Sequence, residues 1–316
     1  MMRPEEKELH TVYRERANAA LARGHAALRP SPLKNLFWAI FGYQRQGEGN
    51  YDAAAEHFKA AAGGYQMVKD WAAATQCLRL YAEALIQVGQ PGLAAGELVE
   101  AAHCCTRAGD DAAPLRRLAA DTYLAANRFD RAAKCVLELA TAAKEENDAA
   151  AAAELFAEAA DLFEKTAAGG DSADCRHCRI MLAELAASDA EAAEMFERLG
   201  RDECVGRRRH GGASYLAKKF FLQSLICHLA LGDAVQARQK QVQFADLDFS
   251  FPGSRENDFA TQLIAAMDEE GSTEAFAEAC ADYDRVTPLD TWKTTVLLRA
   301  KRHIVDGGDE DDPDLR

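Results

Sequence analysis

The stretch Asn-Tyr-Asp-Ala-Ala-Ala-Glu-His-Phe, residues 50–58, decides the fold, because it holds the unit that the chain repeats. A turn-forming residue comes first, a pair of alanines follows, and a large apolar residue closes the unit. The alanine pair returns at residues 94–95, 132–133, 152–153 and 192–193, at separations of 40, 38, 20 and 40 residues. Turn-forming residues, such as Gly89 and Asn147, also precede the later pairs.

This spacing is typical of stacked helix hairpins. A period near 40 residues matches a helix–turn–helix unit, and the single step of 20 residues matches one helix. Small residues let neighbouring helices approach closely, and each hairpin buries its apolar face only by stacking on the next. The repeat therefore predicts an all-α fold, a right-handed α-solenoid of antiparallel helix hairpins. It is similar to tetratricopeptide repeats but has longer helices.

Hydrophobic periodicity places the individual helices. We expect a first helix over 5–28 and further helices near 51–68, 70–88, 91–108, 112–126, 128–146, 148–166, 173–187, 189–203, 213–231 and 233–246. A break at 246–253 precedes three more helices, near 254–270, 272–286 and 290–304. These three should form a helical bundle that caps the last repeat. The predicted domains are a solenoid over 1–246, a C-terminal bundle over 247–304 and an acidic tail over 305–316.

Composition narrows the partners and the compartment. The chain of 316 residues has 51 acidic and 37 basic residues and a formal net charge of −14. Such a chain is repelled by nucleic acid unless it gathers its basic residues locally, so we expect no nucleic-acid partner. The start lacks a secretory signal and no apolar run approaches the ~20 residues that span a bilayer. Nine scattered cysteines indicate buried thiols in a reducing compartment, so we expect a cytoplasmic protein.

Motifs of catalysis are not found in the sequence. It contains no glycine-rich phosphate loop, no Gly-x-Ser-x-Gly and no His-Glu-x-x-His. The best metal candidate is Cys175-x-His177-Cys178 with Cys204 and His210 downstream, but this spacing matches no familiar zinc site. We therefore predict no catalysis, no cofactor and no metal, and keep a zinc enzyme as a minor alternative.

Two terminal segments have features of contact sites. Within the segment 30–45, Leu36, Phe37, Trp38 and Phe41 crowd into six positions, which is too many for a one-sided helix. This cluster either folds back onto the first helices or forms an exposed loop that contacts a membrane surface. At the other end, six acids between 306 and 314 precede Leu315 and Arg316. An apolar residue at the end of a solvated acidic tail favours a role in partner binding.

Motifs along nearly the whole chain resemble the soluble NSF attachment proteins of the alpha/beta type. The most specific is the C-terminal one, with Leu289-Asp290, Trp292, Thr294-Thr295, Leu297-Leu298-Arg299, Lys301 and Ile304 before the acidic tail. Others are Lys69-Asp70-Trp71, Arg128-Phe129-x-x-Ala132-Ala133-Lys134, and Tyr215-x-Ala217-Lys218-x-Phe220-Phe221 leading to Cys227-His228. Proteins of this family are adaptors that bind SNARE complexes and recruit the disassembling ATPase NSF.

The resemblance implies three contact regions. A concave basic groove would hold the SNARE four-helix bundle with Arg128, Lys134, His177 and Lys218. His177 stands where the family usually has Lys, so its charge depends on its surroundings. Acids on the C-terminal bundle and the end of the tail would bind the NSF hexamer; these are Asp268, Glu269, Glu270, Leu315 and Arg316. The loop with Phe37 and Trp38 would touch lipid, which makes the protein peripheral to the membrane.

Some features of the sequence also allow other interpretations of the function. A tetratricopeptide-like scaffold for another protein partner has the same helical repeats, although the Lys, Asn and Arg of a carboxylate clamp are not found. The basic run Arg207–Arg209, which we expect in a loop, could add to a basic surface. Each single basic residue could also belong to an ordinary solvated helix face.

Overall fold

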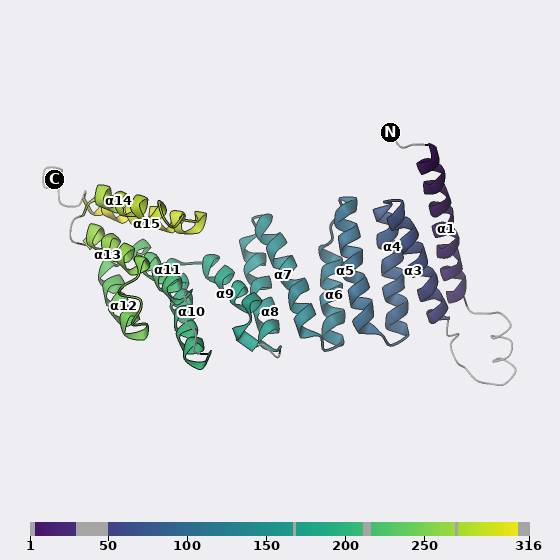
Figure 1. Ribbon diagram of the computed structural model, residues 1–316, viewed down its shortest axis with the longest axis horizontal. Coiled ribbons are helices and arrows are strands. Elements are labelled where there is room, and N and C mark those ends of the chain that lie inside the picture. The colour runs from purple at the N-terminus through teal and green to yellow at the C-terminus, as the bar shows by residue number, and fades with distance from the viewer. Residues whose placement is uncertain (1–3, 30–49, 167–168, 211–215, 269–270, 309–316) are drawn as a thin grey trace. The chain divides into compact units, whose positions relative to one another are not determined.

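The computed structural model describes residues 4–29, 50–166, 169–210, 216–268 and 271–308 (Figure 1). Within these residues every regular element is a helix and no strand occurs, which confirms the all-α prediction. The chain forms two compact units, Met1–Ala167 and Ala168–Arg316, called unit 1 and unit 2 below. The boundary that we predicted after residue 246 stays a prediction.

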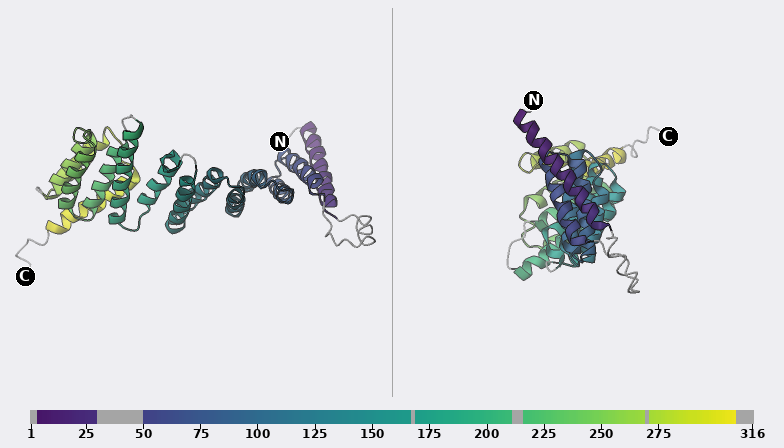
Figure 2. Two further views of the ribbon diagram at one scale, coloured as in Figure 1. Left: turned by 90° about the horizontal axis from the view of Figure 1, so that it is seen from below. Right: turned by 90° about the vertical axis from the view of Figure 1, so that its right-hand side faces the viewer.

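Unit 1 is a row of antiparallel helices in which each helix packs against its neighbours in the chain (Figures 1 and 2). Its helices are α1 (Pro4–Leu28), α3 (Tyr51–Met67), α4 (Trp71–Gln87), α5 (Pro91–Ala108), α6 (Ala113–Ala125), α7 (Phe129–Glu145) and α8 (Ala149–Glu164). From α3 to α8 the predicted helix ends are within two residues of those observed. This packing between successive helices is what the repeat spacing predicts for a solenoid.

The alanine pairs lie at the helix crossings, as their spacing indicates. The first members, Ala54, Ala94, Ala132 and Ala152, are all fully buried. The large residues that follow them, such as Phe58 and Phe156, are also buried and fill the space beside the small ones. Small and large residues therefore alternate within the interfaces of unit 1, which allows close packing of the helices.

Turns of one geometry join the successive helices from α3 to α8. In each, one residue with a positive φ donates its N–H to a carbonyl three residues back, and the next residue donates to a carbonyl five residues back. The residues with positive φ are Lys69, Gly89, Gly109, Asn127 and Asn147. Gly and Asn adopt this left-handed conformation at little cost, so Lys69 is the exception among the five.

Unit 2 is built around one central helix. It contains the short 3₁₀ turn η1 (Gly169–Asp171), α9 (Ala173–Glu184), α10 (Asp189–His210), α11 (Leu216–Ala230), α12 (Ala234–Leu247), α13 (Arg255–Asp268), α14 (Thr273–Asp284) and α15 (Thr291–Gly308). Helix α11 is apolar on almost all sides and packs against α10, α12, α13 and α15. At its centre Phe221 stacks on Phe244 at 4.3 Å between ring centroids, with Phe251 at 5.6 Å.

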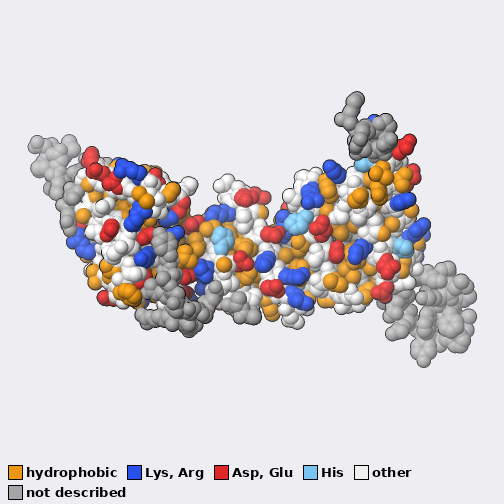
Figure 3. All heavy atoms as spheres, in the orientation of Figure 1, with side chains coloured by type: hydrophobic (Ala, Val, Ile, Leu, Met, Phe, Trp, Pro, Cys, Tyr) orange, Lys and Arg blue, Asp and Glu red, His pale blue; other side chains and the backbone are white. Residues whose placement is uncertain are grey.

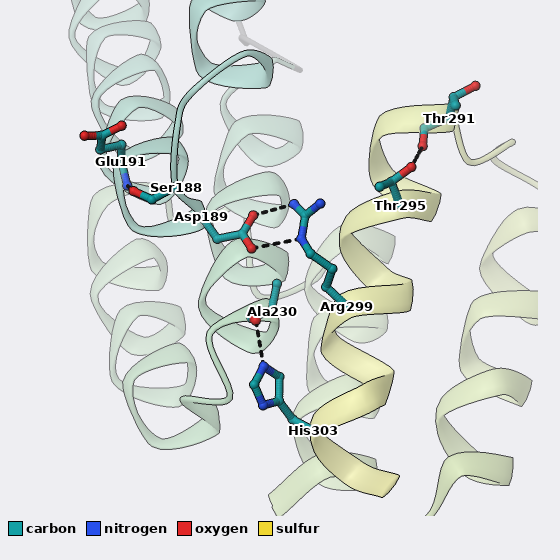
Figure 4. Close-up of polar contacts among 8 residues, drawn as sticks. All are labelled: Ser188, Asp189, Glu191, Ala230, Thr291, Thr295, Arg299 and His303. Atoms are coloured by element: carbon teal, nitrogen blue, oxygen red, sulfur yellow. Dashed lines mark hydrogen bonds and ion pairs between the residues drawn. The ribbon is translucent and has the colours of Figure 1, made fainter. Parts of the chain in front are cut away.

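Helix α15 is fixed to the core of unit 2 by an apolar face and two polar contacts (Figure 4). Val296, Leu297 and Ala300 are buried in the core. Arg299 donates two hydrogen bonds, of 3.0 and 2.5 Å, to the carboxylate of Asp189 at the start of α10. His303 Nε2 lies 2.9 Å from the carbonyl oxygen of Ala230 at the end of α11. The last helix is therefore tied to segments that precede it by 73 and 110 residues.

Two helices are longer than we predicted. Helix α10 continues to His210, so Arg207–Arg209 lies in its last turns and the loop prediction is wrong. Helix α15 continues to Gly308, four residues beyond the predicted end. Neither extension contains a proline, so neither has a residue that would break the helix.

Candidate partner-binding surfaces

The two basic residues predicted for unit 1 lie on α7. Arg128 occupies the N-cap position of α7, where its side chain makes no capping hydrogen bond. Lys134 lies on the exposed side of the same helix. Arg131, three residues from each, is exposed as well, and its guanidinium lies 5.8 Å from the ring centroid of Tyr123. Because residues three apart are neighbours on a helix, these side chains form a continuous basic stripe, which we call the α7 stripe.

Two other arginines near this helix, Arg116 and Arg117, are already paired with acids. Arg116 lies 3.1 Å from Glu138, and Arg117 makes a bidentate contact of 2.6 and 2.9 Å with Glu158. The hydrogen bond to Glu158 raises the pKa of Arg117 above its usual value. By contrast, no ion pair among the described residues involves any member of the α7 stripe. The positive charge of the stripe is thus available to a partner.

The charge in unit 1 is mixed rather than concentrated. On the face in view in Figure 3, Lys and Arg side chains of unit 1 lie interspersed with Asp and Glu. A mixed surface gives little long-range attraction, so the cations that are not held in an ion pair decide where an acidic partner binds. Among the described residues, the cations of the α7 stripe meet that condition. Sequence reasoning selected Arg128 and Lys134 but missed Arg131, although its three-residue spacing from both was readable.

The other two predicted groove residues belong to unit 2. His177 is exposed on α9, whose Cys175 and Cys178 are buried on the opposite side. Lys218 is partly buried in the first turn of α11. The structure thus describes one candidate pair in each unit, and the groove formed by all four residues stays a prediction.

Of the acids predicted to bind NSF, only Asp268 lies within the described residues. It is the last residue of α13 and forms an ion pair of 3.1 Å with Arg238 of α12. This ion pair was not foreseen, and it neutralises part of the charge that the acidic run carries. Glu269, Glu270, Leu315 and Arg316 lie outside the described residues, as do Leu36, Phe37, Trp38 and Phe41 of the predicted membrane-contacting loop.

The cysteines are packing residues of the helix interfaces. Burial raises the pKa of the thiols of Cys77 and Cys135 to about 11 and that of Cys178 to about 12. Such thiols stay protonated at neutral pH, which makes them poor nucleophiles. Among the described residues no three His, Cys, Asp or Glu side chains gather closely enough to hold a metal ion. None of the described helices has the length and apolar character needed to cross a membrane.

Comparison with known proteins identifies the family. A family profile described as "Soluble NSF attachment protein, SNAP" matches residues 15–305. The alpha-soluble NSF attachment protein of Vitis vinifera is 27% identical, with 90% of this chain and 95% of the relative covered. The vesicular-fusion protein SEC17 of Komagataella phaffii is 29% identical, with 85% and 91% covered. The alpha-soluble NSF attachment protein of Homo sapiens is 26% identical, with 94% and 96% covered.

These matches extend over both units and over nearly the full length of each relative. They agree with the all-helical architecture of unit 1 and with the C-terminal motif on α15. The chain therefore belongs to the soluble NSF attachment protein family.

Proposed function

We propose that this chain is an adaptor in vesicle fusion, which binds SNARE complexes and recruits and stimulates the ATPase NSF. The observation that carries the proposal is the extent of the family match, which runs from residue 15 to residue 305 and so includes both units. A tetratricopeptide-like scaffold for an unrelated partner would share the helical repeats of unit 1 but not the C-terminal motif. In this proposal the chain has no catalysis of its own and works in the cytoplasm and at membrane surfaces.

The α7 stripe is the part of unit 1 that we assign to SNARE binding. A SNARE bundle presents a fairly uniform acidic surface, so it is bound by charge rather than by deep pockets. Arg128 and Lys134 are exposed and lack ion pairs among the described residues, which leaves their charge for this contact. His177 and Lys218 of unit 2 would extend the groove.

Charge reversal tests this assignment. Lys134→Glu should weaken binding to a soluble SNARE complex by about fivefold at low salt, and by less at high salt because ions screen the contact. Arg79→Glu on α4 is the matched control, because Arg79 is exposed and already has Glu83 one turn away. Equal affinities of wild type and Lys134→Glu at low salt would remove Lys134 from the SNARE-binding surface.

Recruitment of NSF is assigned to the C-terminal end of the chain. The core of unit 2 and the Arg299–Asp189 contact fix α15, and the tail with Leu315 follows this helix directly. Asp268, Glu269 and Glu270 would supply acidic groups for basic patches on NSF. Because Leu315 follows α15 by only a few residues, the fixed position of this helix limits the region that Leu315 can reach, which favours its binding at one site.

The decisive experiment measures the ATPase rate of NSF with a preformed SNARE complex. We expect the wild-type chain to stimulate the rate and Leu315→Ala to lose most of the stimulation, while SNARE binding stays unchanged. Arg316→Ala serves as a control for removal of a neighbouring side chain. If the wild-type chain fails to stimulate NSF from the same source, the scaffold function becomes the better account.

Membrane contact is assigned to the loop that contains Leu36, Phe37, Trp38 and Phe41. Trp and Phe favour the interface between lipid and water, and several modest contacts gain strength when all partners are held at one membrane. The double variant Phe37→Ser, Trp38→Ser should bind liposomes more weakly and soluble SNARE complexes normally. Equal loss of both activities would argue against a separate membrane role.

A further inference from the structure

A second charged feature of unit 1 lies away from the α7 stripe, at the turn between α3 and α4. An open surface hollow of about 400 Å³, called the cavity below, lies there, lined by residues of α1, this turn, the start of α4 and the end of α5. Its charged lining consists of Arg14, Lys69, Asp70 and Arg107, and Trp71 supplies an aromatic wall. A cavity of this size fits a small ligand or the head of a larger one.

Existing contacts hold the walls of this cavity in place. Arg14 of α1 makes an ion pair with Asp70, whose other carboxylate oxygen accepts a hydrogen bond of 3.3 Å from the N–H of Ala73. The guanidinium of Arg107 lies over the ring of Trp71 at 4.9 Å from the centroid. His10 of α1 lies 2.8 Å from the carbonyl oxygen of Val68, a residue that also lines the cavity. Two of the cations are thus positioned before a ligand arrives.

Lys69 is the third cation, and its backbone conformation is unusual. Its φ is 56°, in the left-handed region, whereas the equivalent turns of unit 1 have Gly89, Gly109, Asn127 or Asn147 at this position. A lysine there costs about 1 kcal/mol relative to glycine, and such cost points to a use for the side chain. The use that the structure offers is a positive charge at the rim of the cavity.

Charge balance indicates the class of ligand. Three cations and one carboxylate line the cavity, which leaves an excess of two positive charges. A carboxylate ligand would balance only one of them, whereas a phosphate monoester carries about −1.5 to −2 at pH 7. Arginine also binds phosphate oxygens in a fork geometry, and Lys adds a compact third charge. We therefore propose that Arg14, Lys69 and Arg107 form a binding site for a phosphate monoester, with Trp71 against the organic part.

The position of the cavity favours a soluble ligand over a lipid headgroup. It lies at the C-terminal end of α3, whereas the loop that we assign to the membrane joins the N-terminal end, where Asn50 N–H donates to Ala27. The 17 residues of α3 span about 25 Å, so the cavity stands well away from the root of the loop. The preference for a soluble phosphate ligand over a lipid headgroup depends on the proposed membrane role of the loop. The proposed phosphate site itself does not depend on that role.

Calorimetric titration of the full chain with glycerol 3-phosphate at low ionic strength tests the site. The key variant is Lys69→Asn, which removes the charge and places a residue that favours the left-handed turn. We expect an affinity at least about tenfold lower and an unfolding midpoint that is unchanged or higher. Arg107→Met should also weaken binding while preserving a contact over Trp71. Arg79→Gln, which removes one charge elsewhere on α4, should leave the affinity within about twofold of wild type.

A second arm distinguishes the two sources of the phosphate. Vesicles that contain phosphatidic acid, a phosphomonoester, are compared with phosphatidylglycerol vesicles of equal surface charge. Equal vesicle binding by wild type and Lys69→Asn assigns the site to a free phosphate, and selective loss on phosphatidic acid assigns it to a lipid headgroup. If Lys69→Asn binds glycerol 3-phosphate as wild type does, or if Arg79→Gln weakens binding equally, the proposed site is wrong.

Discussion

The two units are built from helices of similar length but hold them together differently. In unit 1 each helix contacts mainly its chain neighbours, and side-chain contacts such as Gln66 with Glu100 or Arg117 with Glu158 join residues 34 and 41 positions apart. In unit 2 four helices surround α11, and Arg299 reaches Asp189 across 110 positions. Unit 1 is a series of local interfaces, whereas unit 2 has one shared core.

This difference determines how many helices are affected by a destabilising substitution at one site. The stability of a stacked array is roughly a sum of local terms, so loss at one interface leaves distant helices folded. A core in which four helices pack on a central one has less independence, because removing the centre affects these contacts together. An adaptor gains from both arrangements. A repeat array can adjust along a long partner, and a shared core holds α15 in place.

The largest effect is expected from truncation at the centre of unit 2. Phe221 is fully buried between α10, Phe244 and Phe251, so Phe221→Ala should lower the free energy of unfolding by about 3–5 kcal/mol. Hydrogen exchange should accelerate from α10 through α15 and stay nearly unchanged in α1 to α7. The matched variant Phe156→Ala, at a buried site in α8, should accelerate exchange only in α8 and its neighbour α7. Acceleration through all of unit 1 would contradict the local picture.

Much of unit 1 could be predicted from the sequence, for a physical reason. Alanine pairs at fixed spacing mark helix crossings, and turn residues mark the ends, so local patterns specify both helices and contacts. The α3–α8 ends were predicted within two residues because each turn carries its own signal. The left-handed Lys69 was not foreseen, because nothing in the letters Lys-Asp-Trp shows that the lysine takes the place of a glycine or asparagine.

Unit 2 shows where sequence reasoning ends. The helices and a break at 246–253 were predicted, and the observed break lies between Leu247 and Arg255. The central role of α11, however, depends on contacts between segments far apart in the chain. The pairs Arg299–Asp189 and Asp268–Arg238 give no periodic signal, so pattern analysis cannot find them. Four predicted site residues, Arg128, Lys134, His177 and Lys218, are accessible or partly accessible on helices. Their common groove rests on the resemblance alone.

A second test of the difference between the units uses the same substitution in each. Gly24 and Gly200 are both helix glycines that face a buried phenylalanine ring. A Cβ on Gly24 would lie 2.5 Å from the ring of Phe58, and one on Gly200 would lie 2.4 Å from the ring of Phe221. Both rings are fully buried, so Gly24→Ala and Gly200→Ala should each cost about 1–3 kcal/mol. Exchange should accelerate only in α1 and α3 for Gly24→Ala but from α10 to α15 for Gly200→Ala.

A control for this pair is Gly63→Ala in α3. Nothing lies within 4 Å of a Cβ at Gly63, so this substitution should stabilise the helix by about 0.5–1 kcal/mol. If Gly24→Ala and Gly200→Ala accelerate exchange over equally wide regions, the contrast between a stacked array and a shared core does not hold.

A smaller effect is expected from the long-range ion pair of unit 2. The side chain of Arg299 is 42% exposed and that of Asp189 is 16% exposed, so solvent screens the pair and its coupling should be about 1 kcal/mol. A double-mutant cycle with Arg299→Ala and Asp189→Ala measures this coupling through chemical unfolding. The same single variants should loosen α15 in hydrogen exchange without affecting α1 to α8. A coupling of zero would show that the apolar face alone holds α15.

The smallest effect concerns two glutamates whose pKa values shift in opposite directions. Burial would raise the pKa of Glu197 in α10, but hydrogen bonds from Lys240 and Arg201 lower it below the ordinary 4.5. Burial raises the pKa of Glu97 in α5, and Lys59 offsets this only in part. A lowered pKa gives stability that is present above pH 4.5 and lost as pH falls through the folded value. A raised pKa, as for Glu97, gives stability that is present at low pH and is lost as pH rises through the pKa of the folded state.

Replacing each glutamate with glutamine should therefore change the stability of the protein in opposite directions. At pH 7, Glu197→Gln should destabilise the protein, because it removes a carboxylate that the folded state prefers charged. At the same pH, Glu97→Gln should stabilise it, because it removes a carboxylate that burial disfavours. Urea unfolding at several pH values measures both. The Glu97→Gln difference from wild type should shrink as pH falls through the raised pKa of Glu97, and the Glu197→Gln difference should persist to lower pH and shrink only as pH falls through the lowered pKa of Glu197. If Glu197→Gln instead stabilises the protein at pH 7, the ion pair with Lys240 does not outweigh the cost of burying Glu197. This polar link between helices of unit 2 would then add specificity rather than stability.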